Sequence, residues 1–258
     1  MHRSGQIWTL SKLDFLEKYL PAFNKASKRA GKTFYVDGFA GPGTNQIGKE
    51  VHSGSPLIAL NTKPAFTHYF LVEKDKKTFT SLENRVRQHA LHQYTTLFQA
   101  DFNDVIEPIL EELPKYAPTF FLLDPEGLEL AWSTMEKIGK RNKADVFVLI
   151  SGSGVARNLQ HPQLLTRFFG DDSWQYIRER RERGDFGVDV KDDEAYTRHY
   201  VERLQTLGFG HTKYFLVAST RTQRVLHAWT FVAKHDIAIK IASEVMSKLS
   251  SGSQGRLF

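Results

Sequence analysis

The sequence predicts an α/β fold built on a mostly parallel, seven-stranded sheet that is preceded by a helix and ends in an antiparallel β-hairpin. Two observations support this prediction. Short, almost continuously apolar segments alternate with amphipathic segments through the first 150 residues, as in a parallel sheet covered on both faces. Near the end of the chain, two strand patterns are joined by a short polar turn, which is typical of a hairpin.

The individual elements follow in order along the chain. Ser11 is a suitable N-cap for an amphipathic helix that runs to Phe23, and Pro21 is expected to kink or split this helix. Alternating strands and helices come next, with right-handed crossovers between parallel strands. The expected strands span residues 33–36, 68–72, 95–98, 119–123, 146–150, 213–218 and 225–233, with helices at 76–89, 103–112 and 237–249.

We expect one domain over residues 1–258, because no internal repeat or linker interrupts the chain. Residues 1–31 would be an N-terminal helical segment. Residues 32–150 would form the half that binds a cofactor, and 151–258 the substrate-side helices, the hairpin and the last helix. The only linker-like composition is the Ser- and Gly-rich tail at 250–255, which we expect to be frayed.

The composition excludes several kinds of chemistry. The chain has no cysteine, so it cannot contain a disulfide, a Cys-ligated zinc ion, an iron–sulfur cluster or a cysteine nucleophile. Its histidines show no metal-ligand spacing, and we expect no metal. The first residues lack the apolar stretch of a signal peptide and later apolar runs are only strand-sized, so we expect a cytoplasmic protein without membrane contact.

The charge is unevenly distributed along the chain. Residues 1–35 carry seven basic and two acidic side chains, 36–129 carry eight and thirteen, and 130–258 carry twenty and fourteen. This pattern suits an acidic ligand site flanked by surfaces that face a polyanion such as nucleic acid. The alternative is solvated helix faces, which we favour for the Arg/Glu run at 178–183 because such alternation mostly forms surface ion pairs.

The first predicted strand ends in a glycine-rich segment. Because ligands of open α/β sheets bind beyond the carboxyl ends of the strands, the residues after each strand are candidate site residues. Here an aspartate precedes glycines spaced G-x-x-G-x-G, which would let the backbone approach a ligand while the carboxylate holds a cationic amine. An ordinary turn is the alternative. The candidates are Asp37, Gly38, Phe39, Ala40, Gly41 and Gly43.

A nearby segment, residues 43–50, almost matches a phosphate-binding P-loop. The match fails at Glu50, where the motif needs Ser or Thr to bind magnesium, so we do not expect a nucleoside triphosphatase.

The second and third strands also end in acidic residues. Glu73, followed by Lys74, would accept hydrogen bonds from ribose hydroxyls, with Asp75 as the second choice. Asp101 would bind the amine of an adenine ring covered by Phe102. The alternatives are an exposed charged turn at 73–75 and a helix N-cap at Asp101.

The fourth strand leads into Asp124, Pro125 and Glu126, which we take as the candidate catalytic segment. A carboxylate that ends a buried strand and precedes a rigid proline is held where substrate and cofactor would meet. Such a carboxylate rarely serves only the core.

Taken together, these segments resemble the three-Cys-motif partner (TcmP) family, which is similar to class I S-adenosylmethionine (SAM) methyltransferases with a Rossmann-like fold. The resemblance spans most of the chain and rests on residues 35–43, 54–60, 73–75 and 123–125 and on Trp132. It implies SAM as cofactor and a separate, Cys-bearing partner that resembles radical-SAM enzymes. By the same resemblance, Asp37 would hold the methionine amine of SAM, and Asp124 would orient the nucleophile.

A more distant similarity to ribosomal-RNA adenine-N6 methyltransferases rests on the glycine loop, the Gly-Ser-Pro helix start and the Asp-Pro strand end. It implies methylation of an amino nitrogen of a base in nucleic acid. Glu126 and Gly127 replace the usual proline and aromatic residue, so Phe39 or Trp132 is expected to stack on the base instead. The alternative to an enzyme is a non-catalytic or differently reacting subunit that binds SAM or a nucleoside for the partner, as a monomer or homodimer.

Two further segments and a set of basic residues are also candidates for functional roles. Residues 44–54 form a stretch longer than most strand–helix loops, which we interpret as a lid over the site. The Ser/Gly run at 151–154 either bounds the acceptor pocket or forms a flexible turn. Basic residues of the N-terminal helix and around Arg157, Arg178 and Arg221 are candidates for phosphate contacts.

Overall fold

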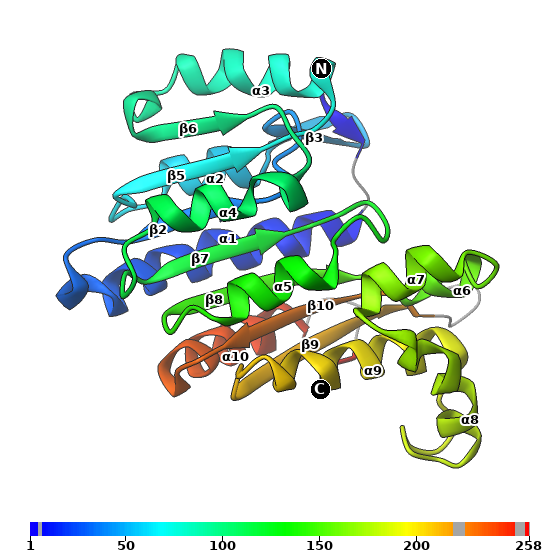
Figure 1. Cartoon of the computed structure of the whole chain (residues 1–258). Helices are drawn as coiled ribbons and strands as arrows, with labels where there is room; N and C mark the ends of the chain where they lie inside the picture. Colours follow the sequence, from blue (N-terminus) through cyan, green and yellow to red (C-terminus); the bar gives the residue numbers. More distant parts are fainter. Residues whose placement is uncertain (5–6, 219–224, 251–255, 258) are drawn as a thin grey trace.

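The computed structural model describes residues 1–4, 7–218, 225–250 and 256–257 (Figure 1). The polar turn at 219–224 and most of the tail at 250–255 lie outside the described residues.

The described strands form one eight-stranded sheet and one small sheet. The large sheet has the order β11-β9-β10-β8-β7-β2-β5-β6, in which the five strands from β8 to β6 are parallel and β10 is antiparallel to β8 (Figure 1). β9 is antiparallel to β10, and β11 is antiparallel to β9. These strands are β2 (Phe34–Asp37), β5 (His68–Val72), β6 (Thr95–Phe98), β7 (Thr119–Leu123), β8 (Ala144–Ile150), β9 (His211–Ala218), β10 (Val225–Ala233) and β11 (Arg256–Leu257).

The predicted fold class is therefore confirmed: the seven longer strands form a Rossmann-like, mostly parallel sheet that ends in an antiparallel hairpin. Four of the predicted strands have the expected bounds. β2 includes one residue more at its carboxyl end than expected, so Asp37 belongs to the strand. The two-residue β11 was not predicted, because it lies beside a segment whose composition is typical of a frayed tail.

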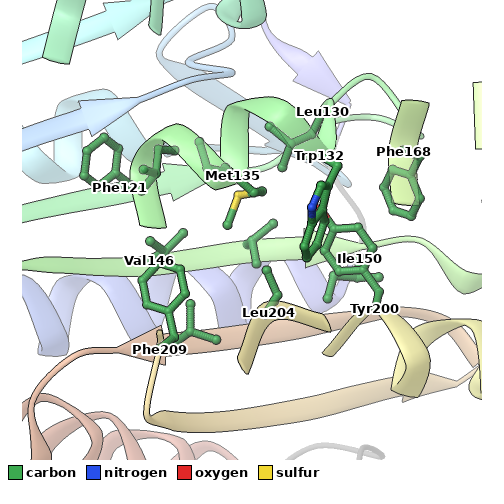
Figure 2. Close-up of a cluster of buried hydrophobic side chains, with 14 of the residues drawn as sticks. Phe121, Leu130, Trp132, Met135, Val146, Ile150, Phe168, Tyr200, Leu204 and Phe209 are labelled. Carbon is green, nitrogen blue, oxygen red and sulfur yellow. The ribbon is translucent and has the colours of Figure 1, made fainter. Parts of the chain in front are cut away.

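Helices cover both faces of the large sheet. α1 (Ile7–Ala26), α2 (Ser55–Asn61), α3 (Lys76–Arg87) and α10 (Asp236–Ser250) lie on one face, around a core that includes Phe15, Tyr19 and Phe147. The other face carries a second core around Trp132, Phe168 and Tyr200 (Figure 2). Its helices are α4 (Phe102–Glu112), α5 (Trp132–Gly139), α6 (Gly152–Arg157), α7 (Pro162–Phe169), α8 (Ile177–Glu182) and α9 (Asp192–Thr206).

The N-terminal helix begins earlier than expected and is not split at its proline. α1 begins at Ile7, four residues before Ser11, so Ser11 is not its N-cap. The helix is also not split at Pro21, since it continues to Ala26. Leu20 and Phe23, on either side of the proline, are buried against the sheet, and this packing outweighs the hydrogen bond that proline cannot make.

Residues 44–54 were expected to be an irregular loop and instead form a hairpin. β3 (Thr44–Ile47) pairs antiparallel with β4 (Glu50–Ser53) and parallel with β1 (Arg3–Ser4). The amide of Gly54 donates to the carbonyl of Gly43 at 2.8 Å, which closes the hairpin. Its pairing rests on backbone hydrogen bonds between mostly polar residues, so the hydrophobic pattern does not indicate it.

The Ser/Gly run at 151–154 is also more ordered than a flexible turn. Ser151 is the N-cap of α6, and its hydroxyl accepts a hydrogen bond from the amide of Gly154 at 3.1 Å. A Cβ at Gly152 would lie 2.0 Å from the carbonyl oxygen of Asp193, so glycine permits α6 to pack closely on α9.

Candidate functional site

A cavity of about 880 Å³, here called the strand-end cavity, lies at the carboxyl ends of β2, β5, β6 and β7. The chain's first three residues form part of its wall, and the N-terminus lies beside α3 and β3 (Figure 1). The predicted site residues that line it are Gly38, Phe39, Gly41, Glu73, Lys74, Asp101, Phe102, Asp124 and Glu126. Asp37, Ala40 and Gly43 do not line it, and Pro125 lines a second cavity.

The glycine-rich turn after β2 is tied to the neighbouring strand. Ala40 donates its amide to the carbonyl of Val72 at 2.9 Å, and Gly41 donates its amide to Glu73 Oε2 at 3.0 Å. Gly41 has a φ of 63°, a conformation that favours glycine. The turn therefore runs along the cavity with its position fixed by the end of β5.

Asp37 is fully buried behind this turn. Its carboxylate accepts hydrogen bonds from the amide of Phe39 at 3.2 Å and from the Tyr35 hydroxyl at 3.1 Å. Burial raises the pKa of Asp37 to about 6, although Ser55 and Lys12 act in the opposite direction. In this geometry Asp37 holds the turn in place and does not face the cavity.

Glu73 lies at the cavity wall with both carboxylate oxygens engaged by backbone amides. Oε2 accepts from Gly41, and Oε1 accepts from Asp75 at 2.8 Å. A carboxylate offers about four lone-pair positions. Glu73 is therefore held firmly and retains capacity to accept hydrogen bonds from a ligand.

Asp101 is an N-cap and also lies at the cavity wall. It caps α4, because Oδ1 accepts from the Asn103 amide at 3.0 Å, and it lines the cavity. Burial alone would raise the pKa of Asp101, but the hydrogen bonds from Lys74 and Asn103 bring it below the usual value. Phe102 is buried beneath the glycine turn, where a Cβ at Gly38 would lie 2.9 Å from its ring.

Asp124 is buried at the end of β7, between two basic side chains. Lys12 from α1 contacts its Oδ2 directly, and Arg3 Nη1 lies 3.4 Å from the same oxygen. Burial alone would raise the pKa of Asp124, but Lys12 and Arg3 lower it below its usual value. Arg3 also reaches Glu126, at 3.6 Å, so it bridges two residues of the predicted catalytic segment.

Arg3 and Lys12 were not singled out from the sequence. Only the charge distribution indicated that basic and acidic segments could meet. An N-terminal segment with seven basic side chains precedes a middle region with an acidic excess. Charge alone does not identify which lysine meets which carboxylate, because Lys12 and Asp124 are 112 residues apart.

A second cavity of about 380 Å³, here called the α1-side cavity, adjoins the first. The two cavities share Arg3, Asp124 and Glu126. Burial lowers the pKa of His227 to about 4, with Lys12 acting in the same direction and Asp124 opposing it. The other residues that line this cavity are Thr9, Lys12, Asn45, Pro125, Leu149, His227 and Trp229.

Of the two aromatic residues expected to stack on a base, only Phe39 lines the strand-end cavity. Trp132 is only 3% exposed and packs edge-on against Tyr200 in the core (Figure 2), with the Arg203 guanidinium 4.6 Å from its ring. The expectation for Trp132 was wrong because the residue begins α5, whose packing directs the ring into the core.

Several basic residues expected to contact phosphate are engaged with acidic side chains. Each arginine of the 178–183 run contacts at least one carboxylate, which confirms the surface ion-pair interpretation. For example, Arg178 pairs with Asp192 at 3.1 Å, and Arg180 pairs with Asp185 and Glu202. Arg157 bonds to Ser153 within α6, and Arg221 lies outside the described residues.

The described ranges hold neither a metal-binding cluster nor a membrane-spanning helix. Within residues 1–4, 7–218, 225–250 and 256–257, no three His, Asp or Glu side chains are grouped so that they could bind a metal ion. In the same ranges, no helix has the length and apolar character needed to span a membrane.

Comparison with known proteins identifies the fold. No protein-family model and no curated protein matches the chain. Among solved structures, LPL1258 of Legionella pneumophila, from family DUF519, is 9% identical with a TM-score of 0.59, over 95% of this chain and 96% of that one. The two proteins therefore share a fold over almost their whole length.

Two further structures are similar at lower scores. The methyltransferase domain of METTL16 is 13% identical with a TM-score of 0.46, over 84% of this chain and 67% of that one. The O-methyltransferase TomG of Streptomyces achromogenes, in complex with SAM, is 11% identical with a TM-score of 0.44, over 85% of this chain and 79% of that one.

Proposed function

We propose that the chain is a SAM-dependent methyltransferase that binds SAM in the strand-end cavity. The observation that carries this proposal is the convergence of Glu73, Asp101 and Asp124, which follow three different strands, on one cavity beside a glycine turn. In open α/β sheets, ligands bind at this edge. The volume of about 880 Å³ is within the usual range for a site that encloses a small molecule.

The residues present suit an adenosine-containing cofactor. Glu73 would accept hydrogen bonds from the ribose hydroxyls, and Asp101 would accept one from the amine of adenine, with Phe39 and Phe102 beside the ring. When bound, SAM would supply an electrophilic methyl group, and the chain would contribute positioning and exclusion of water. Asp37 would act through the turn that it supports.

The hairpin β3–β4 would cover the site. It joins the N-terminal residues that form part of the cavity wall, because β3 pairs with β1. If the hairpin closes over the cofactor, SAM should protect residues 44–54 from proteolysis, and unchanged protection would contradict this role.

For the acceptor, we propose an amino nitrogen of a base in nucleic acid, with a Cys-bearing, radical-SAM-like protein as partner. The net charge of +6 favours a polyanionic substrate, and the Asp-Pro segment at 124–125 supports amino methylation by its resemblance to enzymes of that kind. A flipped base would enter beside Asp124.

One observation favours a second candidate function, that of a non-catalytic subunit which binds SAM or a nucleoside for the partner protein. Both Lys12 and Arg3 contact Asp124, so this carboxylate is already engaged. Methyl transfer from tritium-labelled SAM to total RNA, DNA or the partner would distinguish an enzyme from such a subunit.

Calorimetric titration with SAM tests the cofactor site. Glu73→Gln keeps the shape of the side chain and removes its charge, so we expect the affinity for SAM to fall at least about tenfold. Glu111→Gln is the matched control, because Glu111 is exposed near the opposite end of α4 from Asp101. Failure of the unaltered protein to bind SAM would refute the proposed function.

A further inference from the structure

We propose that the α1-side cavity binds the methyl acceptor, an exocyclic amine of a nucleobase, and that His227 accepts the proton released by this amine. This inference rests on the proposed function, since it places the acceptor relative to the site assigned to SAM. It gives a role to His227 and Trp229, two residues of β10 that line this cavity.

The position of the cavity supports this role. It shares Asp124 with the strand-end cavity, so ligands in the two cavities would meet at that carboxylate. Methyl transfer is an in-line displacement and requires the acceptor to lie next to the cofactor. A volume of about 380 Å³ is at the lower end of the range for small-molecule sites and is sufficient for a single base.

The cavity wall contains an aromatic ring that is held rigidly. Trp229 is 5% exposed and stacks on Phe215 with ring centroids 5.8 Å apart and an interplanar angle of 23°. Phe147 packs against the same indole at 6.4 Å. A ring fixed in this way offers a surface for a planar base without a loss of side-chain freedom on binding.

The charged and titratable groups around the cavity favour an amine over a hydroxyl. Lys12 from α1, Arg3 from β1, and Asp124 and Glu126 beyond β7 line it together with His227 from β10. The pKa of His227 is lowered to about 4 and that of Asp124 lies below its usual value, so both are weak bases. Weak bases cannot deprotonate a hydroxyl, but they can accept the proton of a newly methylated, and therefore acidic, aromatic amine.

The reaction balances with these groups. The amine nitrogen forms the new carbon–nitrogen bond while the methyl–sulfur bond breaks, and sulfur retains the bonding electrons. As this bond forms and the nitrogen becomes acidic, the nitrogen gives one proton to the imidazole of His227, which releases it to solvent. No oxidant or metal ion is required.

Tryptophan fluorescence of the protein with S-adenosylhomocysteine tests base binding without turnover. Short single-stranded RNA containing adenine or cytosine should quench the fluorescence, while oligouridine, which lacks an exocyclic amine, should quench it less. Trp229→Phe should remove most of the quenching. Trp174→Phe is the matched control, because Trp174 is engaged with Thr166 near α7.

Methyl transfer from tritium-labelled SAM to the same RNA tests His227. We expect His227→Asn to slow transfer about a hundredfold, the usual contribution of a proton acceptor, with the affinity for SAM unchanged. His235→Asn, at an exposed position beyond the other end of β10, should leave both unchanged. Circular dichroism would verify that each variant is folded.

The outcomes separate this inference from the proposed function. SAM binding that fails in the unaltered protein refutes the proposed function. SAM binding that is lost in Glu73→Gln but retained in His227→Asn, together with impaired transfer, supports both. The inference is overturned if neither amino-bearing RNA quenches the fluorescence, if transfer survives His227→Asn, or if His227→Asn and Glu73→Gln weaken SAM binding equally.

Discussion

Lys12, on the first helix, contacts the carboxylate of Asp124 at the end of β7. The contact brings the basic N-terminal segment to the acidic middle of the chain, at the point where the two cavities meet. Both residues are less than a tenth exposed, so their charges compensate each other where water screens little.

We therefore expect Lys12→Met to raise the pKa of Asp124. If transfer requires the ionised carboxylate, the acidic limb of the pH–rate profile should shift to higher pH, and Lys12→Arg should restore it. Lys18→Met, at an exposed position on α1, is the control for loss of positive charge. An unshifted profile would show that Lys12 has only a structural role.

The same pair predicts a pH-dependent stability. A carboxylate with a lowered native pKa stabilises the fold above its unfolded pKa, and this stabilisation is lost as the pH falls through the native value. Lys12→Met should therefore lower the free energy of unfolding most at neutral pH and least in acid. At neutral pH we expect a loss on the order of 3 kcal/mol, because the buried carboxylate then has one fewer partner. Urea denaturation at several pH values measures this difference.

Asp101 allows its capping role to be separated from its proposed ligand role. Asparagine is as good an N-cap as aspartate, so Asp101→Asn should leave the free energy of unfolding nearly unchanged while it weakens SAM binding. Asp101→Ala should lose about 1 kcal/mol of stability in addition. Equal SAM affinity in Asp101→Asn and the unaltered protein would contradict a role for this carboxylate in binding.

The strand-end residues could be predicted because they follow from local pattern and chain order. Glu73, Asp101 and Asp124 each follow an apolar strand, and in a parallel sheet the carboxyl ends of strands share one edge. Asp37 shows the limit of this reasoning. It belongs to β2, and the alternation along that strand places its side chain on the same face as that of Tyr35, away from the cavity.

The α1-side cavity could not be predicted from local pattern. Lys12, Asn45, Asp124 and Trp229 come from α1, β3, the end of β7 and β10, and the sequence between them gives no indication that they meet. Likewise, the hairpin at 44–54 has polar strands that differ little in composition from a loop. Long-range packing forms the cavity, and backbone hydrogen bonds form the hairpin.

The closure of that hairpin depends on Gly54. A Cβ at this position would lie 2.8 Å from the carbonyl carbon of Gly43, so Gly54→Ala must push the two backbone segments apart. We expect a loss of about 1–3 kcal/mol in thermal unfolding, as for other overpacked sites. Gly210→Ala, where a Cβ would meet nothing within 4 Å, is the control. Equal stability of the two variants would show that the hairpin base accommodates a methyl group.

Asp145 lies near the start of β8, at the opposite end of the parallel strands from the two cavities. We expect it to determine part of the stability at neutral pH. It is 7% exposed, accepts a hydrogen bond from the Tyr19 hydroxyl at 2.8 Å, and burial raises its pKa from 3.8 to about 7. The native state therefore holds this proton to a higher pH than the unfolded chain does. The free energy of unfolding should fall as the pH rises from about 4 to about 7.

Asp145→Asn removes the charge and keeps an oxygen that can accept from Tyr19. The variant should gain on the order of a few kcal/mol over the unaltered protein at pH 8, and little at pH 4, because ionised Asp145 carries the cost of burial. The raised pKa of Asp37 also lowers the free energy of unfolding as the pH rises. Because Asp37 is present in both proteins, it contributes the same pH dependence to each. Asp14→Asn, at an exposed position on α1, is the control. If the unfolding free energies of Asp145→Asn and the unaltered protein run parallel from pH 4 to pH 8, the native pKa of Asp145 is not raised.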